Sequence, residues 1–140
     1  MNVDKLLELA NTVKKGYHDF GRYKILFNMG TIFTPDTDDR WNYSQWAKEG
    51  APSNLNCAGC LIAFTLLLNG REDFLTLYHD EDVKIDNMAI EARHLLGLNE
   101  EQTSALFFGT LSSSVTGEDA KRVIKSLLVT GDVDWFLIHR

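Results

Sequence analysis

The feature that most constrains this chain is a continuous apolar stretch from Ala58 to Leu68. A helix drawn through it is apolar on every side, and such a helix must be buried on every side. The stretch is far shorter than the ~20 residues that a membrane span needs. We therefore expect a buried central helix at residues 57–69 of a soluble domain, with Asn54 or Asn56 capping its N-terminus.

Composition limits the class of protein. The chain has 140 residues, of which 44% are hydrophobic and 24% charged, as in an ordinary globular domain. Its net charge of −6 disfavours binding to nucleic acid or to an anionic membrane surface and suits a basic protein partner. No secretory signal is visible at the N-terminus, so we expect a cytoplasmic protein with reduced thiols.

Helical periodicity recurs outside the central stretch. Residues 3–13 repeat apolar side chains every three to four positions and are followed by Gly16, a typical helix stop. Residues 86–96 show the same pattern between Asp86, the expected cap, and Gly97. The side chains that we expect this second segment to turn inward are Met88, Ile90, Leu95 and Leu96.

Two capping signals mark further helices. Asn99 followed by Gln102 matches a capping box that opens a short helix ending at Phe108. Thr116 is expected to cap a long helix that ends at Gly131. The apolar face of this helix is predicted to contain Ala120, Val123, Ile124, Leu127 and Leu128.

The remaining segments are less regular. Residues 17–33 are rich in aromatic residues, which leaves either a short strand pair or an extended segment over the core. The apolar tail after Gly131 is expected to dock on the core through Trp135 and Phe136. Together the patterns predict one all-α domain, residues 1–140, with about four or five helices around the buried helix 57–69.

Four segments carry a resemblance. They are FNM at Phe27–Met29, CAGCLIAF at Cys57–Phe64, LLGLNEEQTSALFFG at Leu95–Gly109 and TGEDAKRVIKSLLVTGDVDW at Thr116–Trp135. In this order the chain resembles a family of small uncharacterised proteins of bacteria and their phages. The resemblance implies a helical fold and a bacterial or phage origin. It supplies no activity and no catalytic residue. The family tends to have a CGT-like turn before the helix cysteine, whereas this chain has Asn56-Cys57-Ala58-Gly59-Cys60.

The two cysteines raise two chemical alternatives. At the start of a helix, Cys57 would have a lowered thiol pKa and could act as a nucleophile with His79 or His94 as base. Cys57 and Cys60 could also form half of a zinc site completed by His79 and His94, although no second close pair of ligands follows. The usual role of such cysteines is as small core residues, and we favour it. We expect no catalytic residue, no metal and no cofactor.

Surplus aromatic residues provide the candidate binding site. Trp and Tyr often anchor protein interfaces. The candidates are Trp41, Tyr43, Trp46, Phe107 and Phe108. The leading hypothesis is thus a small cytoplasmic protein-binding module. We expect its partner to be another protein, or a second copy of this chain in a homodimer. One specific version is that the protein blocks the nucleic-acid groove of a host nuclease, which requires that its acidic side chains form a patch. The alternative from another class is a cysteine-dependent enzyme.

Overall fold

The structure is a computed structural model that describes residues 1–35, 57–79, 84–110, 112 and 114–138. Six α-helices and four strands lie within these residues. In chain order they are α1 (Val3–Val13), β1 (Tyr17–Asp19), β2 (Lys24–Phe27), β3 (Phe33–Pro35), β4 (Cys57–Gly59), α2 (Leu61–Leu68), α3 (Glu72–His79), α4 (Ile85–Leu96), α5 (Glu100–Phe108) and α6 (Gly117–Thr130), followed by a 3-10 turn, η2 (Trp135–Ile138).

The all-α prediction is wrong, because four strands form a mixed sheet in the order β1-β2-β4-β3. Strands β1 and β2 pair antiparallel and account for the irregular segment after α1. Strand β4 pairs parallel with β2, with Leu26 opposite Ala58, and antiparallel with β3, with Thr34 opposite Ala58. Each strand is three or four residues long, and apolar runs this short cannot be assigned to strand or helix by periodicity.

The central apolar stretch is divided between a strand and a helix. Cys57 lies in β4, and Cys60 is the N-cap of α2 without a side-chain capping bond, so the expected start at residue 57 and the expected asparagine cap are wrong. Gly59 makes the sharp transition possible. A Cβ there would lie 2.7 Å from the Ala63 Cβ and 2.9 Å from the Ile25 Cδ1. A side chain at residue 59 would therefore separate the end of β4 from the first turn of α2.

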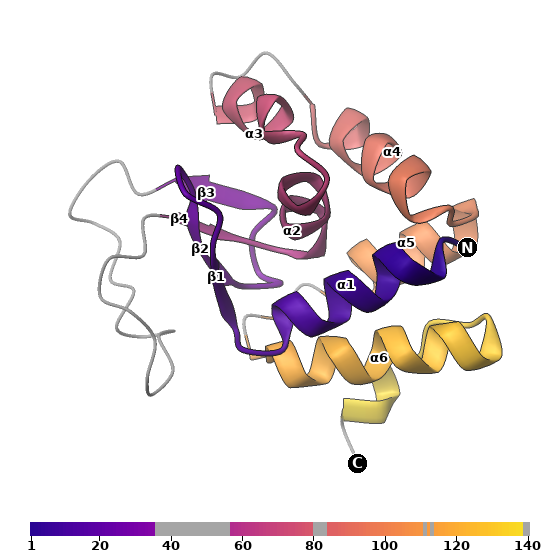
Figure 1. Cartoon of the computed structure of the whole chain (residues 1–140). Coiled ribbons are helices and arrows are strands. Elements are labelled where there is room, and N and C mark those ends of the chain that lie inside the picture. Colours follow the sequence, from indigo (N-terminus) through magenta and orange to yellow (C-terminus); the bar gives the residue numbers. More distant parts are fainter. Residues whose placement is uncertain (36–56, 80–83, 111, 113, 139–140) are drawn as a thin grey trace.

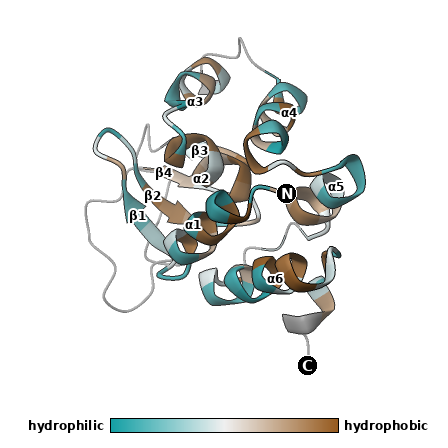
Figure 2. Ribbon diagram, turned by 45° about the vertical axis from the view of Figure 1, so that its right-hand side comes forward, coloured by the Kyte–Doolittle hydropathy of each residue, from teal (hydrophilic) through white to brown (hydrophobic). Residues whose placement is uncertain are grey.

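The prediction of a buried central helix is confirmed. Every residue of α2 from Leu61 to Leu67 is buried, and α2 lies between the sheet and the other helices (Figure 1). Figure 2 shows α2 as hydrophobic, whereas α1 and α4 have one polar and one apolar side. On the sheet side, the Phe64 ring makes edge contacts with the Phe20 and Phe27 rings at centroid distances of 5.9 and 5.8 Å.

Helix ends agree well with the local signals. Both capping boxes are present: the Gln102 N–H donates to Asn99 Oδ1 at 2.8 Å, and the Asp119 N–H donates to Thr116 Oγ1 at 3.1 Å. Gly97 and Gly131 adopt left-handed conformations at the ends of α4 and α6. The predicted apolar face of α6 packs against the buried side of α1, and these two helices run antiparallel side by side (Figure 1). Val3 and Leu7, which belong to the apolar pattern of α1, are exposed.

Three side chains differ from expectation. The N-cap of α4 is Lys84, so Asp86 is not the cap but lies in the first turn. Ile90 was expected to point inward, yet 51% of it is exposed. In the tail, Trp135 is buried and its Nε1–H donates to the Ala105 carbonyl at 2.7 Å, while Phe136 is 78% exposed and does not dock.

No helix in the portion of the chain that the structure describes is long and apolar enough to cross a membrane.

Candidate functional site

The cysteines are core residues. Cys57 is buried within β4 between its two neighbouring strands, and Cys60 is buried at the start of α2. Because Cys57 lies in a strand, the helix N-terminus that was expected to activate it acts on Cys60 instead. Burial dominates there and raises the Cys60 pKa from 9.0 to about 11, although hydrogen bonds from backbone N–H groups of α2 oppose the shift. The Cys60 thiol is therefore neutral at physiological pH.

The histidines expected to complete the site do not meet these thiols. His94 is exposed in the last turn of α4, and α2 lies between α4 and strand β4 (Figure 1). His79 ends α3, and its side chain lies outside the described part. Among the described residues, a set that includes Cys57, Cys60 and His94, no three potential ligands gather to hold a metal ion. The geometry therefore favours neither the thiol enzyme nor the zinc site.

The five aromatic candidates separate into three groups. Trp41, Tyr43 and Trp46 lie outside the described residues. Phe107, also in α5, is fully buried in the core and presents no surface to a partner. Phe108, the last residue of α5, is 38% exposed. Of the two candidates among the described residues, Phe108 is thus the one at the surface.

Phe108 lies in a groove between α4 and α5 of about 360 Å³. Helix α4 contributes Ala89 and Ile90 to its apolar surface, and α5 contributes Phe108. Thr103 and Ser104 of α5 also line it. The residues that line this α4–α5 groove are Asp86, Ala89, Ile90, Arg93, Glu100, Thr103, Ser104 and Phe108.

The two ends of the groove differ in charge. Near the short connection between α4 and α5, Arg93 Nη1 lies 3.6 Å from Glu100 Oε1, and Arg93 Nε donates to the Leu98 carbonyl at 3.1 Å. Two helical turns away along α4, Asp86 is exposed and has no ion-pair partner among the described residues. Within the described part of the chain, the groove therefore combines apolar side chains with a neutralised pair, Arg93 and Glu100, and an unpaired acid, Asp86.

The sequence predicts one half of this groove and not the other. Phe108 is a predicted binding residue because it is aromatic, whereas the helical spacing of Ile90 predicts a core position. The signal that could have corrected the assignment is on α4 itself. Met88, Ala92 and Leu96 are buried, so they already form a core-facing stripe, and Ile90 lies on a different side of the helix.

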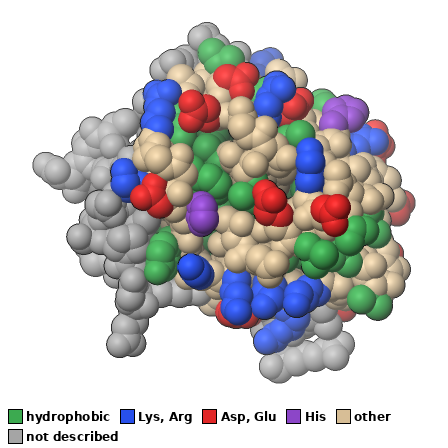
Figure 3. Space-filling model, viewed as in Figure 1, with side chains coloured by type: hydrophobic (Ala, Val, Ile, Leu, Met, Phe, Trp, Pro, Cys, Tyr) green, Lys and Arg blue, Asp and Glu red, His purple; other side chains and the backbone are tan. Residues whose placement is uncertain are grey.

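Charged side chains are unevenly distributed on the face drawn in Figure 3. Acidic side chains occur singly there, interspersed with basic ones, whereas Lys and Arg side chains gather along its lower edge. This face therefore offers no acidic patch of the kind that a nuclease-blocking protein requires.

No known protein family, curated protein or solved structure matches this chain. The function must therefore be inferred from the surface of this chain.

Proposed function

We propose that this protein is a protein-binding module whose α4–α5 groove receives an amphipathic segment of a partner protein. The observation that carries the proposal is the exposure of Ile90 and Phe108 on facing sides of one groove. Isolated exposed apolar residues are common, but neighbouring ones in a concave surface with a charged rim are typical of interaction sites.

The groove indicates the chemistry of the partner. Its apolar side chains offer contacts to one or two apolar side chains of a bound segment, as in other helix-in-groove complexes. Asp86 supplies a carboxylate for a Lys or Arg of that segment, and the net charge of −6 favours approach of a basic protein. The expected occupant is therefore an apolar segment that carries a basic residue at one end.

The partner should be sought in a bacterial cytoplasmic extract, because the resemblance found in the sequence is to bacterial and phage proteins. Tagged protein is used to capture partners, which are identified by mass spectrometry and then titrated in purified form by calorimetry. The decisive comparison is between the wild-type protein and the variants Ile90→Glu and Phe108→Glu. Both side chains are partly exposed, so glutamate should be tolerated without loss of the fold, which circular dichroism checks.

Phe136→Glu is the matched control, because it makes the same replacement at an exposed phenylalanine outside the α4–α5 groove. The proposal predicts a partner that binds the wild type and Phe136→Glu but binds the two groove variants at least about tenfold more weakly. A partner that binds all four proteins equally would refute the groove as the site. Failure to capture any partner that distinguishes them would count equally against the proposal.

A further inference from the structure

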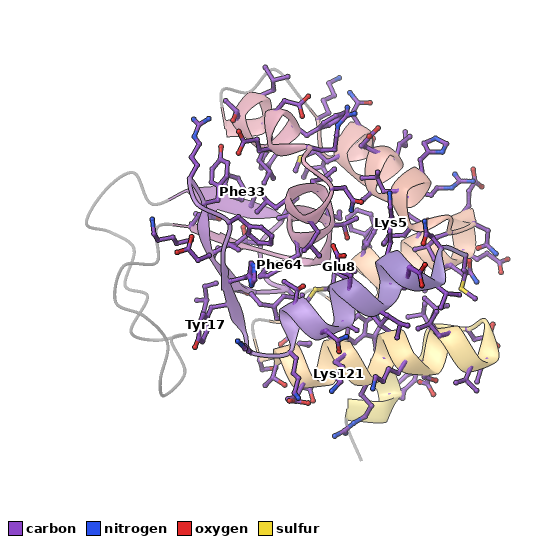
Figure 4. The ribbon with its side chains drawn as sticks, in the orientation of Figure 1. Lys5, Glu8, Tyr17, Phe33, Phe64 and Lys121 are labelled. Carbon is purple, nitrogen blue, oxygen red and sulfur yellow. The ribbon has the colours of Figure 1, made fainter. Side chains whose placement is uncertain are left out.

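A cluster of lysines joins the end of α1 to the first half of α6. Lys14 is the C-cap of α1, and Lys121 and Lys125 lie one helical turn apart on α6. The start of α6 packs against the end of α1, where the Val13 carbonyl approaches Gly117, and this packing brings Lys14 next to the first turns of α6. The Lys121 pKa is lowered by desolvation and by the charges of Lys14 and Lys125, in agreement with that placement. Figure 4 shows Lys121 between α6 and α1.

The cluster is unneutralised. Within the described part of the chain, none of these three lysines has a carboxylate at ion-pair distance, although Glu118 contributes some favourable charge to Lys121. The whole chain carries −6 and the three lysines carry +3, so the remaining residues carry −9. Positive charge concentrated at one place on an otherwise acidic protein creates a positive potential there, which can attract an anionic group of a partner.

Exposed apolar side chains lie on the same face of α1 as Lys14, closer to the N-terminus of the helix. Val3, Leu7 and Lys14 share one helix face by their spacing, and Val3 and Leu7 are 51% and 37% exposed. Leu7 and Lys14 are about 10 Å apart along the helix axis at 1.5 Å per residue. Figure 3 shows basic side chains along the lower edge of the molecule and hydrophobic ones to their right, where the N-terminal part of α1 and the C-terminal part of α6 lie.

We infer that this edge, the α1–α6 strip formed by Val3, Leu7, Lys14, Lys121 and Lys125, docks a short segment of a partner protein in which carboxylates accompany apolar side chains. The carboxylates pair with the lysines, and the apolar side chains cover Leu7 and Val3. At ~3.3 Å per residue, about three residues of extended chain connect the two parts of the strip. The strip is separate from the α4–α5 groove, and the inference does not depend on the function proposed for that groove.

An acidic peptide fits the strip better than the other anionic partners do. A nucleic acid carries a phosphate charge about every 3.4 Å of each strand, and an anionic membrane is charged over a wide area, so the charge of both continues beyond the cluster. Beyond it they would meet a surface that is acidic on balance, including the exposed Asp4 and Glu8 of α1. The phosphodiester backbone of a nucleic acid also makes no apolar contacts that would cover exposed Leu7 and Val3. A short carboxylate-bearing segment uses both parts of the strip and avoids this repulsion.

The test compares three labelled probes at one ionic strength. They are a short fluorescein-labelled peptide of glutamate and leucine, a single-stranded oligothymidylate, and vesicles that contain phosphatidylserine. Lys125→Glu reverses a charge within the strip, and Lys84→Glu is the matched control, because Lys84 is an exposed lysine at the start of α4. Circular dichroism establishes that both variants fold. Ile90→Glu serves to detect binding in the α4–α5 groove instead.

We expect the peptide to bind the wild type and Lys84→Glu alike and Lys125→Glu about tenfold more weakly, with the difference shrinking at high salt. Ile90→Glu should bind the peptide as the wild type does. The inference is overturned if oligothymidylate or vesicles bind more tightly than the peptide, if the two lysine variants behave alike, if Ile90→Glu abolishes binding, or if the peptide does not bind.

Discussion

The carbonyl oxygen of Val13, at the end of α1, packs directly against the Cα of Gly117, the first residue of α6. A methyl group built on Gly117 would collide with that oxygen and with the backbone at Gly16. This contact joins the C-terminus of one helix to the N-terminus of its antiparallel neighbour, so their opposite partial charges lie together. It also fixes the position of Lys14 relative to Lys121.

Gly117→Ala should therefore destabilise the protein. Overpacking of backbone against backbone costs typically about 1–3 kcal/mol, and urea unfolding followed by circular dichroism measures the loss. The sign of the change in unfolding free energy is informative, because replacing glycine by alanine within an unobstructed helix stabilises a protein by about 0.5–1 kcal/mol. Arg122→Ala, at an exposed position of α6, is the control and should change stability by less than about 0.5 kcal/mol. An increase in stability for Gly117→Ala would mean that the two helices are not in contact here.

Trp135 anchors the C-terminal segment to α5. Trp135→Phe keeps most of the apolar contact but removes the hydrogen bond to the Ala105 carbonyl, which should cost about 0.5–1.5 kcal/mol of unfolding free energy. Trp135→Ala also leaves a cavity and should cost about 3–5 kcal/mol. Phe136→Ala, one residue further along and exposed, should be almost neutral. Equal effects at the two positions would show that the tail does not dock through Trp135.

The pH dependence of stability should reveal the raised pKa of the Cys60 thiol. Because its pKa is raised from 9.0 to about 11, the folded protein keeps a proton that the unfolded chain releases within this window. The free energy of unfolding is unaffected below the lower value and falls as pH rises through the window, by at most about 1.4 kcal/mol per pH unit. Unfolding measured across this range for wild type and Cys60→Ala should show a steeper decline in the wild type. Parallel curves would contradict the shift.

The same burial predicts the reactivity of the thiols. Cys57 and Cys60 are both buried, so neither should react readily with a disulfide reagent until the protein unfolds. The measurement is the rate of modification in buffer against the rate in denaturant. A thiol that reacts rapidly in the folded protein near neutral pH would revive the hypothesis of a cysteine-dependent enzyme.

The capping box of α6 is the clearest local determinant of the fold. Thr116→Ala removes the hydroxyl that accepts from the Asp119 N–H, and should cost about 1 kcal/mol. Ser126→Ala, in the middle of the same helix, removes a hydroxyl without a capping role and should be neutral or slightly stabilising. Thermal or urea unfolding of the two variants provides the comparison, and a neutral Thr116→Ala would contradict the cap.

Helices were predictable here where their signals are local. The capping boxes at Asn99 and Thr116, and the glycines at residues 97 and 131, act through hydrogen bonds within a few residues of themselves. The strands were not predictable in this way. Ala58 pairs with Leu26 and Thr34, so its extended conformation depends on residues distant in the chain. The division of the apolar stretch between β4 and α2 is therefore a tertiary effect.

The candidate site shows the same limit at the level of single side chains. Phe107 and Phe108 are adjacent and chemically identical, yet one is buried and the other lies in the α4–α5 groove. Ile90 is apolar, but it lies on a different side of α4 from the buried Met88, Ala92 and Leu96, and the neighbouring helix leaves it uncovered. Periodicity identifies apolar positions and does not say which of them a neighbouring element will cover.

By itself, the sequence determined that residues 61–67 are buried, where α4, α5 and α6 end, and that the protein carries an excess of negative charge. Each of these follows from side-chain chemistry or from hydrogen bonds between near neighbours. Only the tertiary structure decided the mixed sheet, the position of Cys57 in β4 rather than in α2, the exposure of Ile90 beside Phe108 and the gathering of Lys14 with Lys121. These features depend on which distant segments pack together, and the free energy of that packing belongs to pairs of elements rather than to any one stretch of sequence.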